Sequence, residues 1–253
     1  MNIKIENFYF GYKDKNILED INLEFKQGHM YSLLGRNGSG KTTLLKLILG
    51  LLNSEKGTIK IGDTLAKQIT NRKLSQTIAY VPQSEEIIHG IKVIEIVVMG
   101  RNPYLNLFDM PSKKDYELSQ KALENLGIGH LSQKNYDEIS GGERQLALIA
   151  RALVQNTKFI LMDEPISNLD IKNQHDVLAK IKEISQNFNI GILLSIHDPN
   201  LAMKYSDKSI MLSNGKVLYR GDTKEVLCKE SLLQVYNMKF EVLESSNGLN
   251  FVS

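Results

Sequence analysis

A run of glycine, lysine and threonine residues near the amino terminus has the composition of a loop that binds the phosphates of a nucleotide. It fits the pattern G-x-x-x-x-G-K-[ST] with one additional glycine, and its members are Gly35, Arg36, Asn37, Gly38, Ser39, Gly40, Lys41, Thr42 and Thr43. Glycines let successive backbone N–H groups approach phosphate oxygens closely. Lys41 would reach the β- and γ-phosphates, and the Thr42 hydroxyl would bind Mg²⁺. The loop predicts a nucleoside triphosphate without saying how its energy is used.

The residues on either side of this loop predict the two elements that would hold it. Met30–Leu34 is a short apolar run suited to a buried strand, and Thr43–Leu52 is apolar with helical spacing. Strand, loop and helix therefore follow one another in the order that a phosphate-binding loop requires. This order favours the loop over an ordinary glycine-rich turn.

Two acids at the end of a second apolar strand could supply metal binding and proton transfer. The segment Phe159–Pro165 is an apolar run that ends in Asp163 and Glu164. Asp163 could hold Mg²⁺ through water, and Glu164 could accept a proton from the attacking water. The alternative is an ordinary charged turn, since strand ends are often charged. The phosphate loop upstream favours the metal site.

A second glycine-containing helix start occurs in the segment Ile139–Gln145. Ser140 and Glu143 have the S-x-x-E spacing of a capping box, which predicts a well-capped helix. That interpretation does not explain the consecutive glycines Gly141 and Gly142, which each cost about 1 kcal/mol inside a helix. Exposed N–H groups at a helix start bind anions, so the segment is a second candidate phosphate binder.

Composition limits the classes of protein to which the chain can belong. Its 253 residues and 42% hydrophobic content are sufficient for one domain with a subdomain. A net charge of +2 does not favour nonspecific nucleic-acid binding. The lone Cys228 excludes an internal disulfide and indicates a reducing compartment. We find no signal-peptide core and no apolar run of the roughly 18 residues that span a bilayer, so if this protein works at a membrane, something else must hold it there.

Strand and helix patterns alternate along the chain and predict an α/β fold with a largely parallel core. Expected strands lie at 3–5, 21–25, 58–61, 77–81, 158–162, 190–196 and 208–212. Expected helices lie at 113–126, 143–154 and 172–187. Asn214-Gly215 and Asn247-Gly248 are hairpin signals. The mostly helical segment 84–135 interrupts the alternation, which indicates an inserted helical subdomain.

Taken in order, these motifs resemble those of the nucleotide-binding subunit of an ABC transporter. Ile139–Gln145 resembles the family's signature motif, which usually reads LSGGQ, and Phe159–Glu164 resembles its Walker B motif. Ser167–Asp170 resembles the D-loop. The departures are Ile139, Glu143 and Ile166, none of which removes a group needed for phosphate or metal contact.

Three further residues match the family pattern. Gln83 stands at the Q-loop position, His197 at the switch position, and Tyr12 at the position of the aromatic that stacks on adenine. Gln83 and His197, like Gly35–Thr42 and Asp163–Glu164, follow predicted strands, whose ends converge at one edge of a parallel sheet. Tyr12 has no such support, and a lone tyrosine is more often a core or surface residue.

The resemblance implies a fold and a division of the chain. It implies a P-loop NTPase core of the ABC ATPase type, with an N-terminal antiparallel β-subdomain and an inserted helical subdomain. The core with its β-subdomain would occupy residues 1–83 and 155–240. The helical subdomain would occupy 84–154, and a C-terminal extension 241–253.

The resemblance also implies a mechanism. Two copies would sandwich two ATP molecules, each ATP contacting the Gly35–Thr43 loop of one copy and Ser140, Gly141 and Gly142 of the other. Glu164 would be the general base, and His197 would contact the γ-phosphate. Gln83 would sense the metal and the attacking water. The Mg²⁺ that accompanies ATP would be held by Thr42, Gln83 and Asp163.

The segment Val93–Tyr104 resembles that of importer ATPases for iron-siderophores, haem and cobalamin. By this resemblance the chain would act as a homodimer under a separate permease dimer at the cytoplasmic face of the cell membrane. An extracytoplasmic binding protein would act indirectly, and nucleic acid would not be a partner. The Arg101–Tyr104 end would lie near the permease contact, although Val93–Val98 could be merely a buried helix. Zinc or manganese importers and the soluble ATPase of iron–sulfur cluster assembly remain alternatives.

Overall fold

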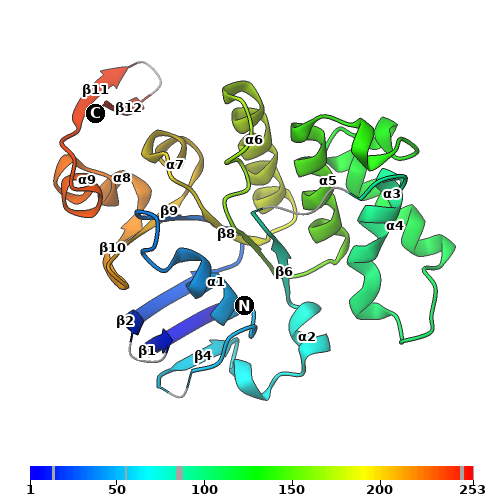
Figure 1. Ribbon diagram of the computed structural model, residues 1–253, viewed down its shortest axis with the longest axis horizontal. Coiled ribbons are helices and arrows are strands. Elements are labelled where there is room, and N and C mark those ends of the chain that lie inside the picture. The colour runs from blue at the N-terminus through cyan, green and yellow to red at the C-terminus, as the bar shows by residue number, and fades with distance from the viewer. Residues whose placement is uncertain (13–14, 55, 84–87, 246–247, 253) are drawn as a thin grey trace.

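A computed structural model describes residues 1–253 except 13–14, 55, 84–87, 246–247 and 253. Its centre is a six-stranded sheet of the described residues with the order β10-β9-β3-β8-β7-β6 (Figure 1). The strands are β3 (Met30–Leu34), β6 (Ile78–Val81), β7 (Phe159–Met162), β8 (Gly191–Ser195), β9 (Lys208–Ser213) and β10 (Lys216–Asp222). All pairings are parallel except β9–β10. The predicted parallel core is confirmed, and the carboxyl ends of its strands meet at one edge.

A second, antiparallel sheet lies beside this core, with the order β2-β1-β4-β5. It contains β1 (Asn2–Tyr12), β2 (Lys15–Lys26), β4 (Thr58–Ile61) and β5 (Thr64–Leu65). Helix α1 (Lys41–Ile48) packs between the two sheets, where Leu44, Leu45 and Ile48 are buried. The predicted helix was too long, because Gly50 adopts φ +68 and the chain turns away there.

Helices of the middle of the chain gather on one side of the core sheet (Figure 1). They are α3 (Val93–Val98), the 3₁₀ turns η2 (Met99–Tyr104), η3 (Gly129–Leu131) and η4 (Tyr136–Glu138), α4 (Lys113–Asn125) and α5 (Gly141–Val154). We call residues 88–154 the helical region. The helix predicted at 143–154 begins two residues earlier, at Gly141, because Ser140 is its N-cap. Residues 84–87 of the predicted helical segment lie outside the described residues.

The remaining elements complete the core and the C-terminal part. They are η1 (Ala66–Gln68), α2 (Asn71–Ser75), α6 (Ile171–Asn187), α7 (Pro199–Tyr205), α8 (Thr223–Val226), α9 (Lys229–Tyr236), β11 (Glu241–Ser245) and β12 (Gly248–Val252). The Asn214-Gly215 hairpin is confirmed, with φ of 48° and 75° joining β9 to β10. Strands β11 and β12 pair antiparallel as the second hairpin signal predicts, although Asn247 lies outside the described residues.

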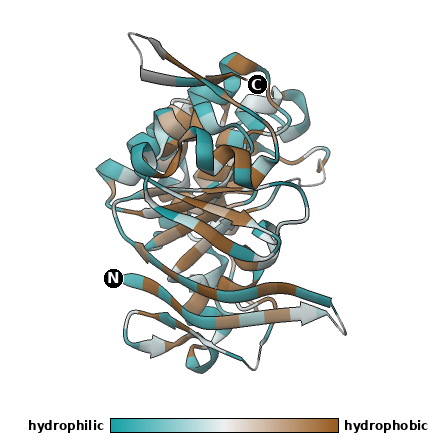
Figure 2. Ribbon diagram, turned by 90° about the vertical axis from the view of Figure 1, so that its left-hand side faces the viewer, coloured by the Kyte–Doolittle hydropathy of each residue, from teal (hydrophilic) through white to brown (hydrophobic). Residues whose placement is uncertain are grey.

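Two hydrophobic clusters cover opposite faces of the core sheet. Along β7, Ile160 and Met162 belong to the cluster shared with the helical region, whereas Phe159 and Leu161 belong to the cluster shared with α1 and the antiparallel sheet. This alternation follows from the two-residue period of a strand. Brown residues accordingly gather in the middle of the molecule in Figure 2. Within the described part of the chain, we find no helix with the length and apolarity needed to cross a bilayer.

Candidate functional site

The loop Gly35–Thr43 joins β3 to α1 in a conformation that depends on its glycines. Gly35, Gly38 and Gly40 have φ of 150°, 79° and 107°, in a region that side chains rarely adopt. Gly40 is the N-cap of α1, and no side chain caps this helix. The N–H groups of the first turn are therefore available to an anion.

Lys41 is almost fully buried beneath this loop. Its Nζ donates hydrogen bonds to the carbonyl oxygens of Gly35 (2.8 Å) and Arg36 (3.3 Å). Burial lowers the pKa of the Lys41 ammonium, while the carboxylates of Glu164 and Asp163 act in the opposite direction. The ammonium is thus held at the loop by two backbone acceptors and by the charge of two acids.

A cavity of about 470 Å³ lies over the loop. Its lining comes from the loop, the start of β2 and the two strand ends opposite, and consists of Lys15, Ile17, Asn37, Gly38, Gly40, Lys41, Thr42, Thr43, Gln83 and Glu164. The structure thus brings the predicted loop residues together with Gln83 and Glu164. Ser39 lies underneath, with its hydroxyl buried and without a hydrogen-bond partner among the described residues. Arg36 is exposed beside the cavity.

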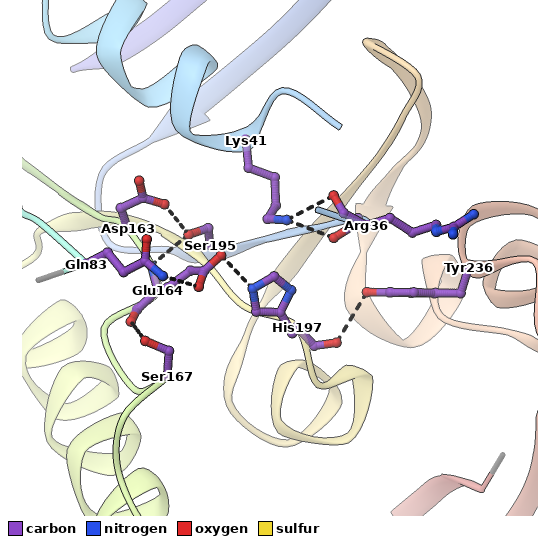
Figure 3. A network of polar contacts seen from close by, with 10 residues as sticks. Arg36, Lys41, Gln83, Asp163, Glu164, Ser167, Ser195, His197 and Tyr236 are labelled. Carbon is purple, nitrogen blue, oxygen red and sulfur yellow. Dashed lines mark hydrogen bonds and ion pairs between the residues drawn. The ribbon is translucent and has the colours of Figure 1, made fainter. Parts of the chain in front are cut away.

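Glu164 stands at the centre of a network of three side chains from different strand ends (Figure 3). Gln83 Nε2 donates to Glu164 Oε2 at 2.8 Å, and His197 Nε2 lies 2.5 Å from Glu164 Oε1. Glu164 has φ of 46°, a left-handed conformation that costs a non-glycine residue of order 1 kcal/mol. The strained backbone aims the carboxylate at the cavity, and both of its oxygens are held in place.

Ser195 fixes this pair of acids and was not among the predicted site residues. Its hydroxyl donates to Asp163 Oδ1 (2.7 Å) and accepts from the backbone N–H of Glu164 (2.7 Å). Asp163 itself is only 2% exposed. The only sequence signal for Ser195 was its place near the end of the apolar run Ile190–Ile196. Many buried strands contain a serine, so this signal is not specific. The pairing of β7 with β8 is what places Ser195 beside Asp163 and Glu164.

The donors around the loop suit a magnesium ion. Mg²⁺ prefers hard oxygen ligands and is usually bound through one or two protein groups, waters and substrate phosphates. Thr42 lines the cavity with a hydroxyl, and Asp163 has a carboxylate of which only one oxygen bonds to Ser195. Among the described residues we find no cluster of three acids, histidines or cysteines that would bind a metal by protein ligands alone.

Tyr12 lies beside the cavity and does not line it. Its ring is half exposed and packs edge-to-face on Phe10, with 4.9 Å between ring centroids. Its cross-strand partner Lys15 does line the cavity. The position is compatible with stacking on a base, but within the described part of the chain we find no contact between Tyr12 and the other site residues.

Ser140, Gly141 and Gly142 begin α5 on the far side of Glu164. The capping box is present: Glu143 N–H donates to Ser140 Oγ (3.3 Å), and Ser140 N–H donates to Glu143 Oε2 (2.7 Å). These bonds lower the pKa of the Glu143 carboxyl, with the Ser140 backbone contributing most. The acid that departs from the family signature is therefore turned toward its own helix.

A smaller cavity of about 210 Å³ opens in front of α5. Gly141 lines it together with Gln83 and Glu164, which also line the cavity of the loop. The two glycine-rich helix starts consequently share two residues at the strand ends and have separate cavities. Gln145 also lines the smaller cavity, and its buried Nε2 has no hydrogen-bond partner among the described residues.

Arg101 and Tyr104 bond inward to the helical region. Arg101 donates to Asp115 Oδ1 (2.9 Å) and to the carbonyl of Val154 (3.1 Å), and its guanidinium stacks 4.0 Å from the centre of the Tyr104 ring. The Tyr104 hydroxyl donates to the carbonyl of Gln155 (2.9 Å). Both side chains therefore join η2 to α4 and the end of α5, so substituting them would disturb the fold as well as any surface nearby.

Comparison with known proteins gives consistent matches over the whole chain. A family model described as "ABC transporter" matches residues 18–167. An uncharacterized ABC transporter ATP-binding protein of Methanocaldococcus jannaschii is 40% identical over 252 residues, covering 100% of this chain and 97% of the relative. A protein of Helicobacter pylori strain 26695 named "probable iron chelatin transport ATP-binding protein" is 35% identical and covers 98% of each chain.

A solved structure agrees with these matches. It is an inward-facing conformation of an ABC transporter assigned to the metal-chelate type, with a TM-score of 0.86 and 31% identity. The alignment covers 99% of this chain and 96% of that one. The fold expected from the sequence, an α/β ATPase core with an antiparallel β-subdomain and inserted helices, is confirmed.

Proposed function

Because this chain belongs to the ABC transporter family, we propose that it hydrolyses ATP to energise uptake of an iron chelate, such as a siderophore complex or haem, or of cobalamin. It is an ATP-binding subunit whose relatives include an iron chelatin transport protein, and this relationship supports the iron-chelate substrate over zinc or manganese. Importer subunits of this kind work with a separate permease. The observation that carries the proposed chemistry is Glu164, held by Gln83 and His197 at the mouth of the loop cavity.

The reaction follows from the charges around the cavity. The open N–H groups of α1 and the Lys41 ammonium bind the phosphates. On binding, Lys41 replaces its present acceptors, the carbonyl oxygens of the loop, by phosphate oxygens. Thr42, Asp163 and Gln83 would hold Mg²⁺, which would supply positive charge to neutralise the phosphates. Glu164 accepts a proton from the attacking water, and Gln83 orients that water. His197 keeps the carboxylate in place and contacts the γ-phosphate.

A second copy of the chain completes the site. The capped start of α5 has its own cavity beside Gln83 and Glu164 instead of lining the cavity of the loop. Ser140, Gly141 and Gly142 therefore contact the nucleotide of a partner subunit, and Tyr12 stacks on the adenine of its own subunit's nucleotide.

We divide the chain into three parts. Residues 1–83 with 155–240 form the ATPase core, 84–154 the helical subdomain and 241–253 a C-terminal extension.

The working assembly is a homodimer on the cytoplasmic face of the cell membrane. The permease dimer docks on the helical subdomain, and an extracytoplasmic binding protein delivers the substrate to it. We propose no role for nucleic acid, consistent with the net charge of +2.

The Glu164→Gln variant tests the assignment of the base. It keeps the size and hydrogen bonding of the side chain but removes the proton acceptor, so kcat should fall by at least about 100-fold while ATP affinity changes by less than about threefold. The matched control is Glu183→Gln on α6, whose carboxylate pairs with Lys180 at the surface. Steady-state ATPase assays, nucleotide binding and sedimentation with ATP provide the readouts. We expect the Glu164→Gln variant to form a closed dimer with ATP. Normal turnover in this variant would overturn the assignment of Glu164 as the base.

The substrate class is tested with the permease that copurifies with this subunit. The reconstituted complex in liposomes is supplied in turn with binding protein loaded with ferric siderophore, haem, cobalamin, zinc or manganese. Stimulation of ATPase activity by an iron chelate or cobalamin alone supports the proposal. Stimulation by zinc or manganese, or purification with a soluble scaffold in place of a membrane protein, contradicts it.

A further inference from the structure

The chain directly after His197 is held by two C-terminal elements that the proposed chemistry does not use. Tyr236, the last residue of α9, donates a hydrogen bond from its hydroxyl to the carbonyl oxygen of His197 at 3.3 Å (Figure 3). Three residues further on, Asn200 exchanges two hydrogen bonds with the backbone of Phe251 in β12, of 3.0 and 2.7 Å. The segment His197–Asn200 is thus fixed from both α9 and the C-terminal hairpin.

Tyr236 also reaches the phosphate loop. The backbone of Gly35 lies within hydrogen-bonding reach of the same hydroxyl. Burial raises the pKa of Tyr236 to about 12, so the hydroxyl remains a protonated donor at physiological pH. Its ring packs edge-to-face on Phe240, with 6.1 Å between centroids. The Tyr236 hydroxyl therefore bonds to the backbone of the histidine segment and lies close to that of the phosphate loop.

These contacts continue into the hydrolysis network. The carbonyl of Gly35 accepts from Lys41, and the ring of His197 bonds to Glu164. A backbone shift at His197 would move its ring relative to the Glu164 carboxylate, and a 2.5 Å contact leaves little room for such a shift.

We propose that Tyr236 is a positioning residue for ATP hydrolysis, which ties the His197 backbone to Gly35 and so sets the histidine ring against Glu164. The C-terminal helix and hairpin then belong to the hydrolysis machinery, with Asn200 and Phe251 as the second attachment. This inference rests on the proposed role of His197. A purely structural Tyr236 would instead dock α9 through its ring, and the hydroxyl would have no effect on turnover.

The Tyr236→Phe variant separates these two roles because it removes the hydroxyl and keeps the ring. Tyr219→Phe is the matched control, since the Tyr219 hydroxyl also bonds to α9, at Gln234, but contacts none of the site residues. We expect Tyr236→Phe to lower kcat about fivefold, the effect of one ordinary hydrogen bond, and to change KM for ATP by less than about twofold. Tyr219→Phe should have the kcat of the wild type.

A double-mutant cycle with His197→Ala provides the decisive measurement. If Tyr236 acts through His197, the substitution Tyr236→Phe has no further effect on the residual kcat of His197→Ala. An equal fivefold loss in both backgrounds, or a wild-type kcat in the single variant, overturns the inference. Loosening of the fold would give a different result. If Tyr236→Phe merely loosened helix α9, it would lower the Tm and reduce kcat in both backgrounds.

Failure of the inference can be told apart from failure of the proposed function. If His197→Ala lowers turnover to a measurable residual rate and Glu164→Gln abolishes it, but Tyr236→Phe does not reduce it, only the positioning role is lost. If Glu164→Gln retains normal turnover, the proposed site itself is wrong. The Asn200→Ala variant tests the second attachment, the hydrogen bonds between Asn200 and Phe251. If Asn200→Ala lowers kcat in the wild type but not in the His197→Ala background, this attachment acts by the same mechanism.

Discussion

Two helix starts that contain glycine lie on either side of Glu164, and they are built in opposite ways. Helix α1 begins at Gly40 without a side-chain cap, below a loop in which three glycines have positive φ. Helix α5 begins at Ser140 with a complete capping box, and neither of its glycines has positive φ. Backbone conformation shapes the first site, and side chains shape the second.

The difference extends through the helical region. Helix α4 also has a complete capping box, formed by Ser112 and Asp115, and Asp115 pairs with Arg101 as well. The two longest helices of the helical region, α4 and α5, therefore hold their starts with carboxylates, whereas the phosphate loop leaves its N–H groups open for a ligand. A site that binds its own nucleotide needs open donors. The start of α5, which we propose meets a partner's nucleotide, must keep its shape without one.

The largest effect expected from this contrast comes from exchanging glycine for alanine at each helix start. A Cβ at Gly35 would lie 2.3 Å from the Leu212 carbonyl oxygen, at a φ that alanine rarely adopts. A Cβ at Gly141 would meet only the Leu169 side chain, at 3.7 Å. Gly35→Ala should destabilise the fold by roughly 3 kcal/mol or more and abolish ATP binding. Gly141→Ala should leave the Tm unchanged.

Thermal unfolding and nucleotide titration check this pair. A normal Tm and normal ATP affinity in Gly35→Ala would contradict the prediction that backbone conformation shapes the loop. If Gly141→Ala keeps the wild-type Tm, a loss of its ATPase activity supports the proposed contact with a partner's nucleotide.

A second, smaller effect is acid sensitivity of the helical region. Hydrogen bonds from Ser112 and Arg101 lower the pKa of Asp115 to about 2, from a usual 3.8. A lowered folded-state pKa stabilises the protein fully above the unfolded value, and this stabilisation is lost as pH falls from about 4 toward 2. It amounts to about 2 kcal/mol in total, of which about 1 kcal/mol is lost between pH 5 and pH 3.

Denaturant unfolding of the wild type and of Asp115→Asn at pH 5 and pH 3 measures this contribution. The asparagine can still cap α4 but carries no charge, so the variant should lose about 1 kcal/mol less than the wild type between the two pH values. Equal losses in the two proteins would show that Asp115 does not make the region acid-sensitive.

The smallest effect concerns the cap of α5 alone. Ser140→Ala removes the acceptor of the Glu143 N–H bond and should cost about 1 kcal/mol. Glu143→Gln restores the family residue and keeps both bonds of the box, so its stability should stay within about 0.5 kcal/mol of the wild type. Chemical denaturation compares the two variants. A larger loss for Glu143→Gln than for Ser140→Ala would mean that charge, rather than the box, holds the helix.

Regular elements with strong local signals were predicted well. Met30–Leu34 and Thr58–Ile61 are strands at the predicted bounds, and the Asn214-Gly215 turn is where the dipeptide indicates. The end of α1 was misjudged because the apolar pattern continues past Gly50, where the backbone turns. Short elements with weak periodicity, such as α7 and the 3₁₀ turn η2, gave no usable local signal.

Contacts between distant segments could not be predicted in the same way. Arg101 and Tyr104 read as surface residues of a docking segment, yet they bond to Asp115, Val154 and Gln155. Their partners are 14 to 53 residues away in the chain, and no local pattern reports such a distance.

The sequence by itself determined the chemistry of this protein. Glycine spacing, one lysine and two acids at a strand end predict a phosphate loop and a metal site, because these depend on residue types within a few positions of each other. Tertiary structure alone decided how Gln83, Glu164 and His197 share hydrogen bonds. It also decided that Ser195 bonds to the backbone of Glu164 and Tyr236 to that of His197. Those contacts depend on which strands are neighbours in the sheet and where α9 packs, which long-range packing sets after the local elements have formed.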